Sequence, residues 1–247
     1  YVDTEAQCRH QERSNLVQFG LTIAMPQAQL EAKKPSEEGV KYVADIGCGY
    51  ESDWFGSKAV VKRFDMDANC KPDVRCDVQT IPEYDETFDI VAARHVLEHF
   101  MWDECPSLVR EWLRILKVGG ELWIGVQNLA YAAKEIIKAD ENANYDAGIY
   151  PLWQLYGRQD GSEGEVHRCG FTRHGLERLL LSCGLEEVKV ELVGESGESL
   201  LAKGKKVVPS KIIAIGPVWR KMMRESDNGP EEIKLSTTEI IEIGEKV

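Results

Sequence analysis

One short segment, residues 42–49 with the sequence YVADIGCG, constrains the fold of this chain more than any other. Its apolar run stops at the acidic Asp45 and is followed at once by Gly47 and Gly49. In a parallel sheet, such a strand leads the backbone to a nucleotide-like ligand, and glycine permits close approach because a Cβ would collide with that ligand. A lone Gly-x-Gly also occurs at ordinary turns, so its meaning depends on the rest of the chain.

The rest of the chain alternates short apolar segments with helical patterns. We expect strands at 59–64, 73–76, 88–92, 121–126 and 188–193, followed by a short antiparallel return at 211–215. Helices are expected at 106–116, ended by Lys117 and the pair Gly119-Gly120, and from the N-cap Thr172 to Cys183. Residues 128–170 lack such a pattern and are interpreted as an insertion over a binding face. This alternation predicts an α/β fold with a parallel, doubly wound sheet.

Three acidic residues, Asp45, Asp65 and Asp77, stand at the carboxyl ends of the first three expected strands. Those ends line one edge of a parallel sheet, so the carboxylates can face a single crevice. Asp65 is placed to accept hydrogen bonds from two ribose hydroxyls, and Asp77 from an adenine amino group, with the backbone N–H of Val78 reaching a ring nitrogen. Asp45 would orient the glycine turn or receive an ammonium group. Each acid alone could be a helix cap or a surface charge, but together they predict a nucleoside site.

The ligand of this site is not expected to contain a pyrophosphate. A dinucleotide site uses G-x-G-x-x-G, whose third glycine admits close helix packing. Here Ser52 occupies the third position, and residues 50–58 leave little room for a crossover helix. Together with the adenine-side Asp77, this disfavours a nicotinamide oxidoreductase.

Composition and charge restrict the partners. The formal charge of −12 disfavours nucleic acid, because affinity for phosphates needs a broad basic surface. The most basic cluster is Lys203, Lys205, Lys206 and Lys211, for which a solvated hairpin edge is favoured over a phosphate-binding patch. Residue usage is that of a soluble globular protein, and 247 residues suit one large domain. We therefore expect a small-molecule partner, while a homo-oligomer remains compatible with the sequence.

Cysteine usage and hydropathy indicate the compartment. The seven cysteines are scattered without a C-x-x-C pair, which is typical of reduced thiols, and clustered metal ligands are lacking, so no metal is expected. No apolar run approaches the roughly 20 residues that span a bilayer, and the first residues lack the basic-then-apolar pattern of a signal. We expect a cytoplasmic protein with no membrane partner.

Five ordered motifs, DIGCG, FDMD, CDVQTIP, FDIVAARHVLEH and LRILKVGGELWI, resemble the class I S-adenosylmethionine-dependent methyltransferases. The resemblance covers residues 41–126 well and the later helix and strands more loosely. The motifs of this chain, including LYGRQ and HRCGFT, look most like those of compact bacterial and phage-type enzymes found beside sugar or natural-product genes. It implies a Rossmann-like doubly wound seven-stranded sheet of order 3-2-1-4-5-7-6, with the last strand antiparallel, and S-adenosylmethionine as cofactor.

The resemblance also implies a division of the chain. We expect a single methyltransferase domain over residues 1–247, made of an N-terminal helical arm (1–40), a cofactor-binding half (41–126), a substrate-covering insertion (127–171), a C-terminal helix and hairpin (172–216) and a tail (217–247). Cofactor contacts carry over to residues at the strand ends, namely Asp45, Gly47, Cys48, Gly49, Asp65, Met66, Asp77, Val78, Arg94, His95 and His99.

A methyl donor that is already a sulfonium needs little activation, so the rate should come from aligning the acceptor, excluding water and, in some cases, a general base. His167 and His95 are the candidate bases, and for His167 the roles of base and loop pin both remain open. Tyr150, Trp153 and Tyr156, together with His167, would form the acceptor pocket, although aromatic residues near helical spacing also serve as packing.

The expected activity is methyl transfer to a hydroxyl or amine of a small, sugar-like or natural-product-like molecule. Two alternatives stay open: a non-catalytic cofactor-binding scaffold of the same fold, and a methyltransferase acting on a macromolecule. Sequence cannot name the acceptor atom, because a fold does not fix the substrate.

Overall fold

A computed structural model describes residues 39–50, 55, 58–159 and 163–208, which all belong to one compact unit. The expected N-terminal arm lies outside the described residues except for its last two positions, and so does the expected tail at 217–247. Most of the first crossover, residues 51–54 and 56–57, also lies outside them. None of the helices in the described part is both long and apolar enough to span a membrane.

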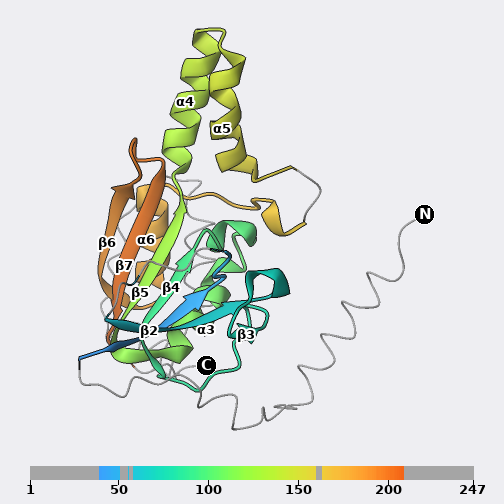
Figure 1. Cartoon of the computed structure of the whole chain (residues 1–247). Coiled ribbons are helices and arrows are strands. Elements are labelled where there is room, and N and C mark those ends of the chain that lie inside the picture. The colour runs from blue at the N-terminus through green and yellow to red at the C-terminus, as the bar shows by residue number, and fades with distance from the viewer. Residues whose placement is uncertain (1–38, 51–54, 56–57, 160–162, 209–247) are drawn as a thin grey trace. The chain divides into compact units, whose positions relative to one another are not determined.

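The centre of the fold is a seven-stranded sheet in the order β3-β2-β1-β4-β5-β7-β6, shown in Figure 1. Its strands are β1 (Lys41–Ile46), β2 (Ala59–Asp65), β3 (Val74–Arg75), β4 (Phe88–Arg94), β5 (Leu116–Gln127), β6 (Leu185–Val193) and β7 (Ser199–Lys206). The pairs among β1 to β5 are parallel, whereas β7 runs antiparallel to both β5 and β6. The predicted order, with an antiparallel last strand, is confirmed.

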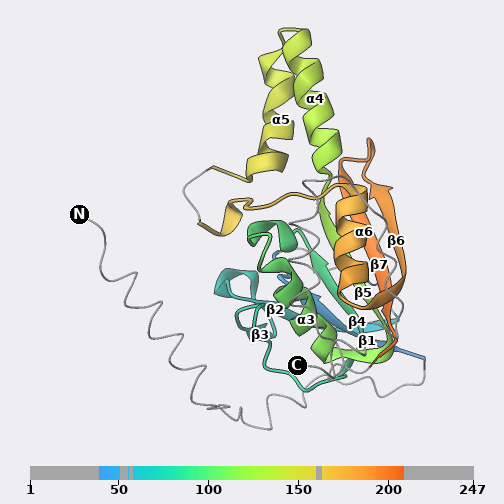
Figure 2. The ribbon, with the colours of Figure 1, turned by 180° about the vertical axis from the view of Figure 1, so that it is seen from behind.

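Helices α3 (Cys105–Ile115) and α6 (Arg173–Ser182) lie on the same face of this sheet, as Figure 2 shows. The expected apolar stripe of α3, including Leu108, Val109 and Trp112, is buried. In α6, the side chain of Thr172 accepts a hydrogen bond from the N–H of Gly175, so the predicted N-cap is confirmed. Short 3₁₀ segments are η1 (Ala68–Cys70), η2 (Leu97–His99) and η3 (Glu163–Glu165).

The end of α3 differs from the prediction. The helix ends at Ile115 and β5 begins at Leu116, so the proposal that Lys117 and the glycine pair end the helix was wrong. Leu116 already pairs with Phe88 of β4, and the register then shifts before Ile90. Pairing with β4 thus takes the chain into the sheet before the expected stop signal is reached.

A lysine from the far end of the chain caps α3. The ammonium Nζ of Lys206 donates to the carbonyl oxygens of Leu113 (2.9 Å) and Leu116 (2.7 Å), and its side chain is fully buried. A cation is favourable at a helix carboxyl end, where carbonyl groups lack partners within the helix. The interpretation of this lysine as part of a solvated hairpin edge was therefore wrong, because β7 lies between β5 and β6.

Replacing Lys206 with methionine removes the cap and leaves buried carbonyl groups unpaired. We expect the free energy of unfolding to fall by about 2–4 kcal/mol, measured by urea denaturation. Lys205→Met is the matched control, because Lys205 is partly exposed and meets Glu187 only at 3.8 Å. Equal losses for the two variants would contradict the capping role.

The antiparallel return was expected at the wrong place. Residues 211–215 lie outside the described residues, and the closing strand is β7, in the stretch between the two expected strands at 188–193 and 211–215. In β7 every second residue is buried, but the run SLLAKGKK hides this alternation because its buried positions include Gly204 and Lys206. Hydropathy alone therefore missed the strand.

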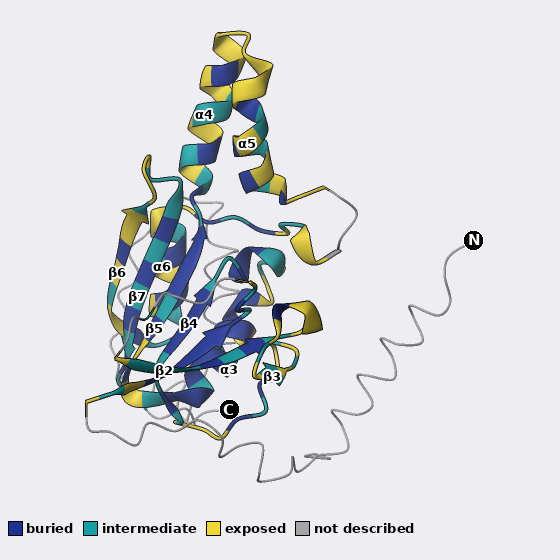
Figure 3. Ribbon diagram, in the orientation of Figure 1, coloured by how far each residue is buried: buried dark blue, intermediate teal, exposed yellow. Residues whose placement is uncertain are grey.

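The sequence of residues 128–170 shows no regular helical pattern, yet the segment contains two helices. These are α4 (Leu129–Glu141) and α5 (Tyr145–Tyr156), which pack together as a helical hairpin. Asn128 caps α4 through the N–H groups of Ala130 and Tyr131, and Asn144 caps α5 through Ala147. Figure 3 shows that both helices are largely exposed. Because so little of the hairpin is buried, its sequence lacks a continuous apolar stripe.

Candidate active site

Side chains of the neighbouring strand β2 fix the glycine turn that follows β1. Gly47 and Gly49 adopt positive φ angles of 60° and 55°. A Cβ on Gly47 would meet Val96 at 2.4 Å, whereas a Cβ on Gly49 would meet no atom of the described residues within 4 Å. The N–H of Gly49 donates to Oδ2 of Asp65 (2.9 Å), and its carbonyl accepts from Nη2 of Arg63 (2.9 Å). Two side chains of β2 therefore fix the turn.

Asp65 connects this turn to the loop after β2. Its Oδ1 accepts the N–H of Asp67 at 2.9 Å, while Oδ2 accepts that of Gly49. Each carboxylate oxygen has a further lone pair, so both can also accept from ligand hydroxyls. Next to it, Met66 is 68% exposed and its carbonyl accepts from Nε of Arg75. This geometry fits the ribose role expected for Asp65.

Asp77 and Val78 follow β3, one strand further along the sheet. Asp77 is exposed, and its Oδ1 accepts the N–H of Gln79 at 2.9 Å. The carbonyl of Val78 accepts the indole N–H of Trp112 at 3.1 Å. The backbone beyond β3 is thus anchored to helix α3, next to the position expected for an adenine ring.

Asp45 is a buried carboxylate without a protein partner. Its residue is only 9% exposed, and within the described residues it makes no hydrogen bond or ion pair. Burial raises its pKa to about 6, although Arg94 and Arg63 oppose the rise. A buried carboxylate of this kind suits a cationic ligand group beside the glycine turn. Together with the positive φ of Gly49, this carboxylate is of the kind that the methionyl part of S-adenosylmethionine would need.

The chain leaves β4 through Arg94 and His95. His95 has a positive φ of 53°, its N–H donates to the carbonyl of Gly125 (2.8 Å), and its Nδ1 donates to Oε1 of Glu98 (3.0 Å). Such a backbone is uncommon outside glycine and clusters at functional sites. Cys48, also expected near the cofactor, is buried within the turn.

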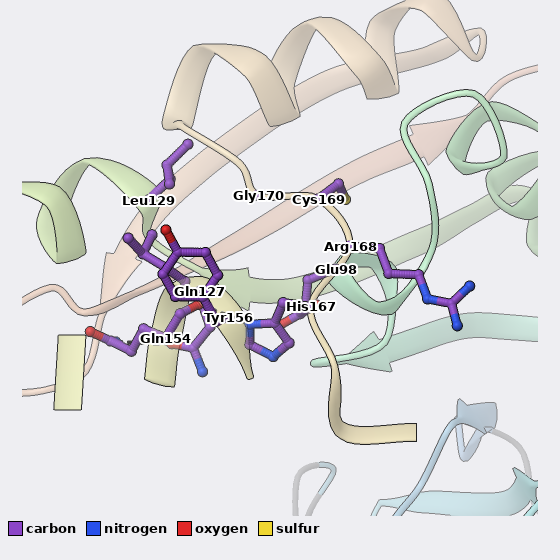
Figure 4. Close-up of a pocket in the computed structure, with 10 residues that line it drawn as sticks. Glu98, Gln127, Leu129, Gln154, Tyr156, His167, Arg168, Cys169 and Gly170 are labelled. Carbon is purple, nitrogen blue, oxygen red and sulfur yellow. Dashed lines mark hydrogen bonds between the residues drawn. The ribbon is translucent and has the colours of Figure 1, made fainter. Parts of the chain in front are cut away.

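A cavity of about 280 Å³ is lined by Gln127, the last residue of β5, and by residues after β4, and Figure 4 shows its lining side chains. Its lining comes from η2, β5, the hairpin and the segment before α6, namely Glu98, Gln127, Leu129, Gln154, Leu155, Tyr156, His167, Arg168, Cys169 and Gly170. Residues that follow β4 line it, and β4 is the strand that pairs with β1, which leads into the glycine turn. Such a place suits the second reactant of a cofactor-dependent reaction.

His167 lines this cavity, and a hydrogen bond from its Nδ1 defines the tautomer of its ring. Its Nδ1 lies 2.9 Å from the carbonyl oxygen of Gln154, which can only accept, so Nδ1 carries the proton. Burial lowers the pKa of His167 below its ordinary value of 6.5. The neutral ring therefore has a lone pair at Nε2. The ring of His99 packs edge-on against it with centroids 4.9 Å apart, and the Nδ1 of His99 donates to Val166.

The structure brings some of the expected acceptor residues together and not others. Tyr156 and His167 line the cavity, whereas Tyr150 and Trp153 are half-exposed on α5 and do not. Five residues at the site were not predicted from the sequence, namely Arg63, Glu98, Gln127, Gln154 and Arg168. An acid in an otherwise apolar run, as in VLEHF, was the one signal available for Glu98. Within the described residues, no group of three or more acidic, histidine or cysteine side chains could hold a metal ion.

Comparisons with known proteins agree with this geometry. Residues 24–140 match a protein family described as "Hypothetical methyltransferase". The chain is 38% identical over 86 residues to the 25S rRNA (adenine(645)-N(1))-methyltransferase of Schizosaccharomyces pombe. This match covers 33% of the chain. The chain spans about a quarter of that curated relative, since the match covers 26% of its length.

Solved structures with a similar fold have low sequence identity. A "possible exported protein" of Bordetella parapertussis has a TM-score of 0.50 and 14% identity, covering 68% of this chain and 62% of that one. The 1,6-didemethyltoxoflavin-N1-methyltransferase of Burkholderia thailandensis, solved with S-adenosylhomocysteine, has a TM-score of 0.47 and 17% identity, covering 68% of this chain and 72% of that one. At such identities the likeness concerns the fold.

The strand order 3-2-1-4-5-7-6, the acids and glycines at the carboxyl ends of β1 to β3, and the family match all point to the same class. Residues 24–140, a little under half of the chain, are thus similar to a methyltransferase family, within a sheet whose strand order is the one expected for class I S-adenosylmethionine-dependent methyltransferases.

Proposed function

We propose that the chain transfers a methyl group from S-adenosylmethionine to a hydroxyl or amine of a small acceptor bound in the cavity beside His167. The observation that carries this proposal is the cavity itself. Its volume of about 280 Å³ is just below the roughly 300–1,000 Å³ of typical small-molecule sites. Its lining includes Glu98, which follows β4, the strand that pairs with β1.

The chain's own residues divide the work. Asp65 would hold the ribose hydroxyls, Asp77 and Val78 the adenine, and Asp45 the ammonium group, while the backbone at Gly49 admits close approach. When bound, S-adenosylmethionine supplies a methyl group whose bond to sulfur breaks with the electron pair remaining on sulfur. Holding the acceptor at the end of β4 would align its lone pair with that methyl group.

His167 would accept the proton that the acceptor loses. Its Nε2 has a lone pair because Nδ1 donates to Gln154, and burial keeps the ring neutral near pH 7. The same hydrogen bond also holds the loop of His167 at the cavity. His167 could therefore act both as the base and as the residue that fixes its loop, the two roles that the sequence leaves open. His95, the other candidate base, has its Nδ1 engaged by Glu98.

A second candidate function is methylation of RNA. The observation in its favour is the match to a relative that acts on an adenine of 25S rRNA, although the formal charge of −12 weighs against phosphate binding. Incubation with S-adenosylmethionine carrying a labelled methyl group separates the candidates. Label in purified rRNA rather than in small amines or alcohols would favour the second candidate.

Two measurements test the leading proposal. Calorimetric titration should show S-adenosylmethionine binding at one site per chain, and release of S-adenosylhomocysteine should depend on an added acceptor. A folded chain that binds no S-adenosylmethionine would contradict the proposal. Binding without turnover on any acceptor would instead support a non-catalytic scaffold.

Gly49→Ala separates the role of this glycine in cofactor binding from its role in folding. Because a Cβ there meets no atom of the described part of the chain, the opposition to the substitution that this part shows is the positive φ, at a cost of about 1–2 kcal/mol of stability. We expect a folded variant whose affinity for S-adenosylmethionine falls at least about tenfold through collision with the ligand. Calorimetry with a thermal-melt control measures both, and unchanged affinity would contradict the close approach.

Asp45 predicts a pH dependence of stability without cofactor. Its folded pKa of about 6 exceeds the ordinary 3.8, so its stabilising contribution is present below 3.8 and is lost as pH rises through about 6. At pH 8, Asp45→Asn should therefore raise the free energy of unfolding by up to about 3 kcal/mol. Urea denaturation at pH 8 and pH 5 should show this gain shrinking at the lower pH. A gain that does not depend on pH would contradict the assignment.

A further inference from the structure

Two buried hydrogen-bond acceptors in the cavity have no partner among the described residues. They are Oε2 of Glu98 and Oε1 of Gln154. Glu98 is 1% exposed and Gln154 is 5% exposed, and both line the cavity. A buried acceptor left without a donor is costly, and more so when it is charged. A ligand that brings donors to these two atoms would remove that cost.

Glu98 is ionised in its buried position. Burial opposes ionisation, but the hydrogen bond from His95 and the nearby histidines hold the pKa of Glu98 below its ordinary value. His95 donates to Oε1 at 3.0 Å, so the unpartnered Oε2 is the oxygen left for a ligand. An ionised carboxylate has no proton to donate, and Oε2 can only accept.

Gln154 also presents an acceptor, because its amide orientation is fixed. Its Nε2 donates to Oε1 of Gln127 (3.0 Å) and to the carbonyl of Glu198 (3.1 Å), two atoms that can only accept. The amide oxygen is therefore the end without a partner. The neutral ring of His167 adds a third acceptor at Nε2, and Figure 4 shows Arg168 directed away from Gln154 and Tyr156.

We propose that the cavity binds its acceptor through a nitrogen group with at least two N–H donors, which Glu98 Oε2 and Gln154 Oε1 receive. This inference rests on the proposed function and narrows its acceptor to an amine or an amino-substituted heteroaromatic ring. A hydroxyl offers a single donor and would leave one buried acceptor without a partner. A carboxylate or phosphate at this place would meet the charge of Glu98 unfavourably.

Matched pairs of probes test the proposal on the full chain saturated with S-adenosylhomocysteine. Benzylamine is compared with benzyl alcohol, and adenine with purine, by ligand-observed NMR titration. We expect at least one amino compound to bind about tenfold or more tightly than its partner without the amino group. Preference for adenine identifies a heteroaromatic acceptor, and preference for benzylamine an aliphatic amine.

Glu98→Gln tests the residue itself, because it keeps the shape of the side chain and removes its charge. We expect the affinity for the preferred amine to fall about 10- to 100-fold, with the affinity for S-adenosylhomocysteine unchanged. Glu98→Asp keeps the charge but shortens the side chain by one methylene, and it should lose less affinity for the amine than Glu98→Gln does. Glu141→Gln, at the exposed end of α4, is the matched control and should change neither affinity.

The outcomes separate this inference from the proposed function. Equal binding of the paired probes, binding of neither amine, or an unchanged amine affinity in Glu98→Gln would overturn the inference while S-adenosylhomocysteine still binds. A folded wild-type chain that binds no S-adenosylhomocysteine would instead overturn the proposed function.

Discussion

Replacing Asp65 with alanine is expected to lower the affinity for S-adenosylmethionine by about 100-fold, because two charge-assisted hydrogen bonds to the ribose hydroxyls are lost. The same carboxylate holds the N–H groups of Gly49 and Asp67, so the glycine turn also loses its support. Asp65→Asn keeps the shape and one acceptor oxygen, and it should lose less affinity. Calorimetric titration of each variant measures the effect.

Asp140→Ala is the matched control for Asp65, because Asp140 is exposed on α4. Its affinity for the cofactor should equal that of the wild type. If Asp65→Ala binds S-adenosylmethionine as tightly as this control does, the carboxylate does not hold the ribose and the cofactor lies elsewhere.

Replacing His167 with glutamine should reduce turnover by about 100-fold, because glutamine has no basic nitrogen to accept the acceptor's proton. Cofactor affinity should stay unchanged, since the cavity is distinct from the glycine turn. The wild-type rate should fall as pH drops below the lowered pKa of His167, because protonation occupies Nε2. The acidic limb of the rate profile therefore lies below pH 6.5, and the variant should lack it.

His174→Gln is the control for this variant, since His174 is exposed on α6 and meets Glu177 at 3.3 Å. Steady-state assays across pH 5 to 8 compare the two. An unchanged turnover in His167→Gln would leave His167 only as the pin that holds its loop to Gln154.

The sheet could be predicted because its signals are local. Apolar runs that end in Asp45 and Asp65 mark β1 and β2, and the capping hydroxyl of Thr172 marks the start of α6. Parallel pairing then places the acids at one edge of the sheet, because side chains at the carboxyl ends of neighbouring strands share that edge. The strand order came from the family resemblance and not from these local signals.

The features that sequence missed depend on distant partners. Lys206 contacts carbonyl groups about ninety residues earlier in the chain, at separations of 93 and 90, and no local pattern shows that a lysine will be buried there. The cavity likewise joins Glu98 after β4 to Gln154 on α5 and to His167. The exposed α4–α5 hairpin has few buried positions, so periodicity could not reveal the helix that positions Gln154.

A crystal structure of the chain with S-adenosylhomocysteine tests the central claim most directly. We predict the ribose hydroxyls on Asp65, the adenine beside Asp77 and Val78, and the sulfur facing the cavity that Glu98 and His167 line. A nucleoside bound away from the carboxyl ends of β1 to β3, or a sulfur atom facing away from that cavity, would contradict the account.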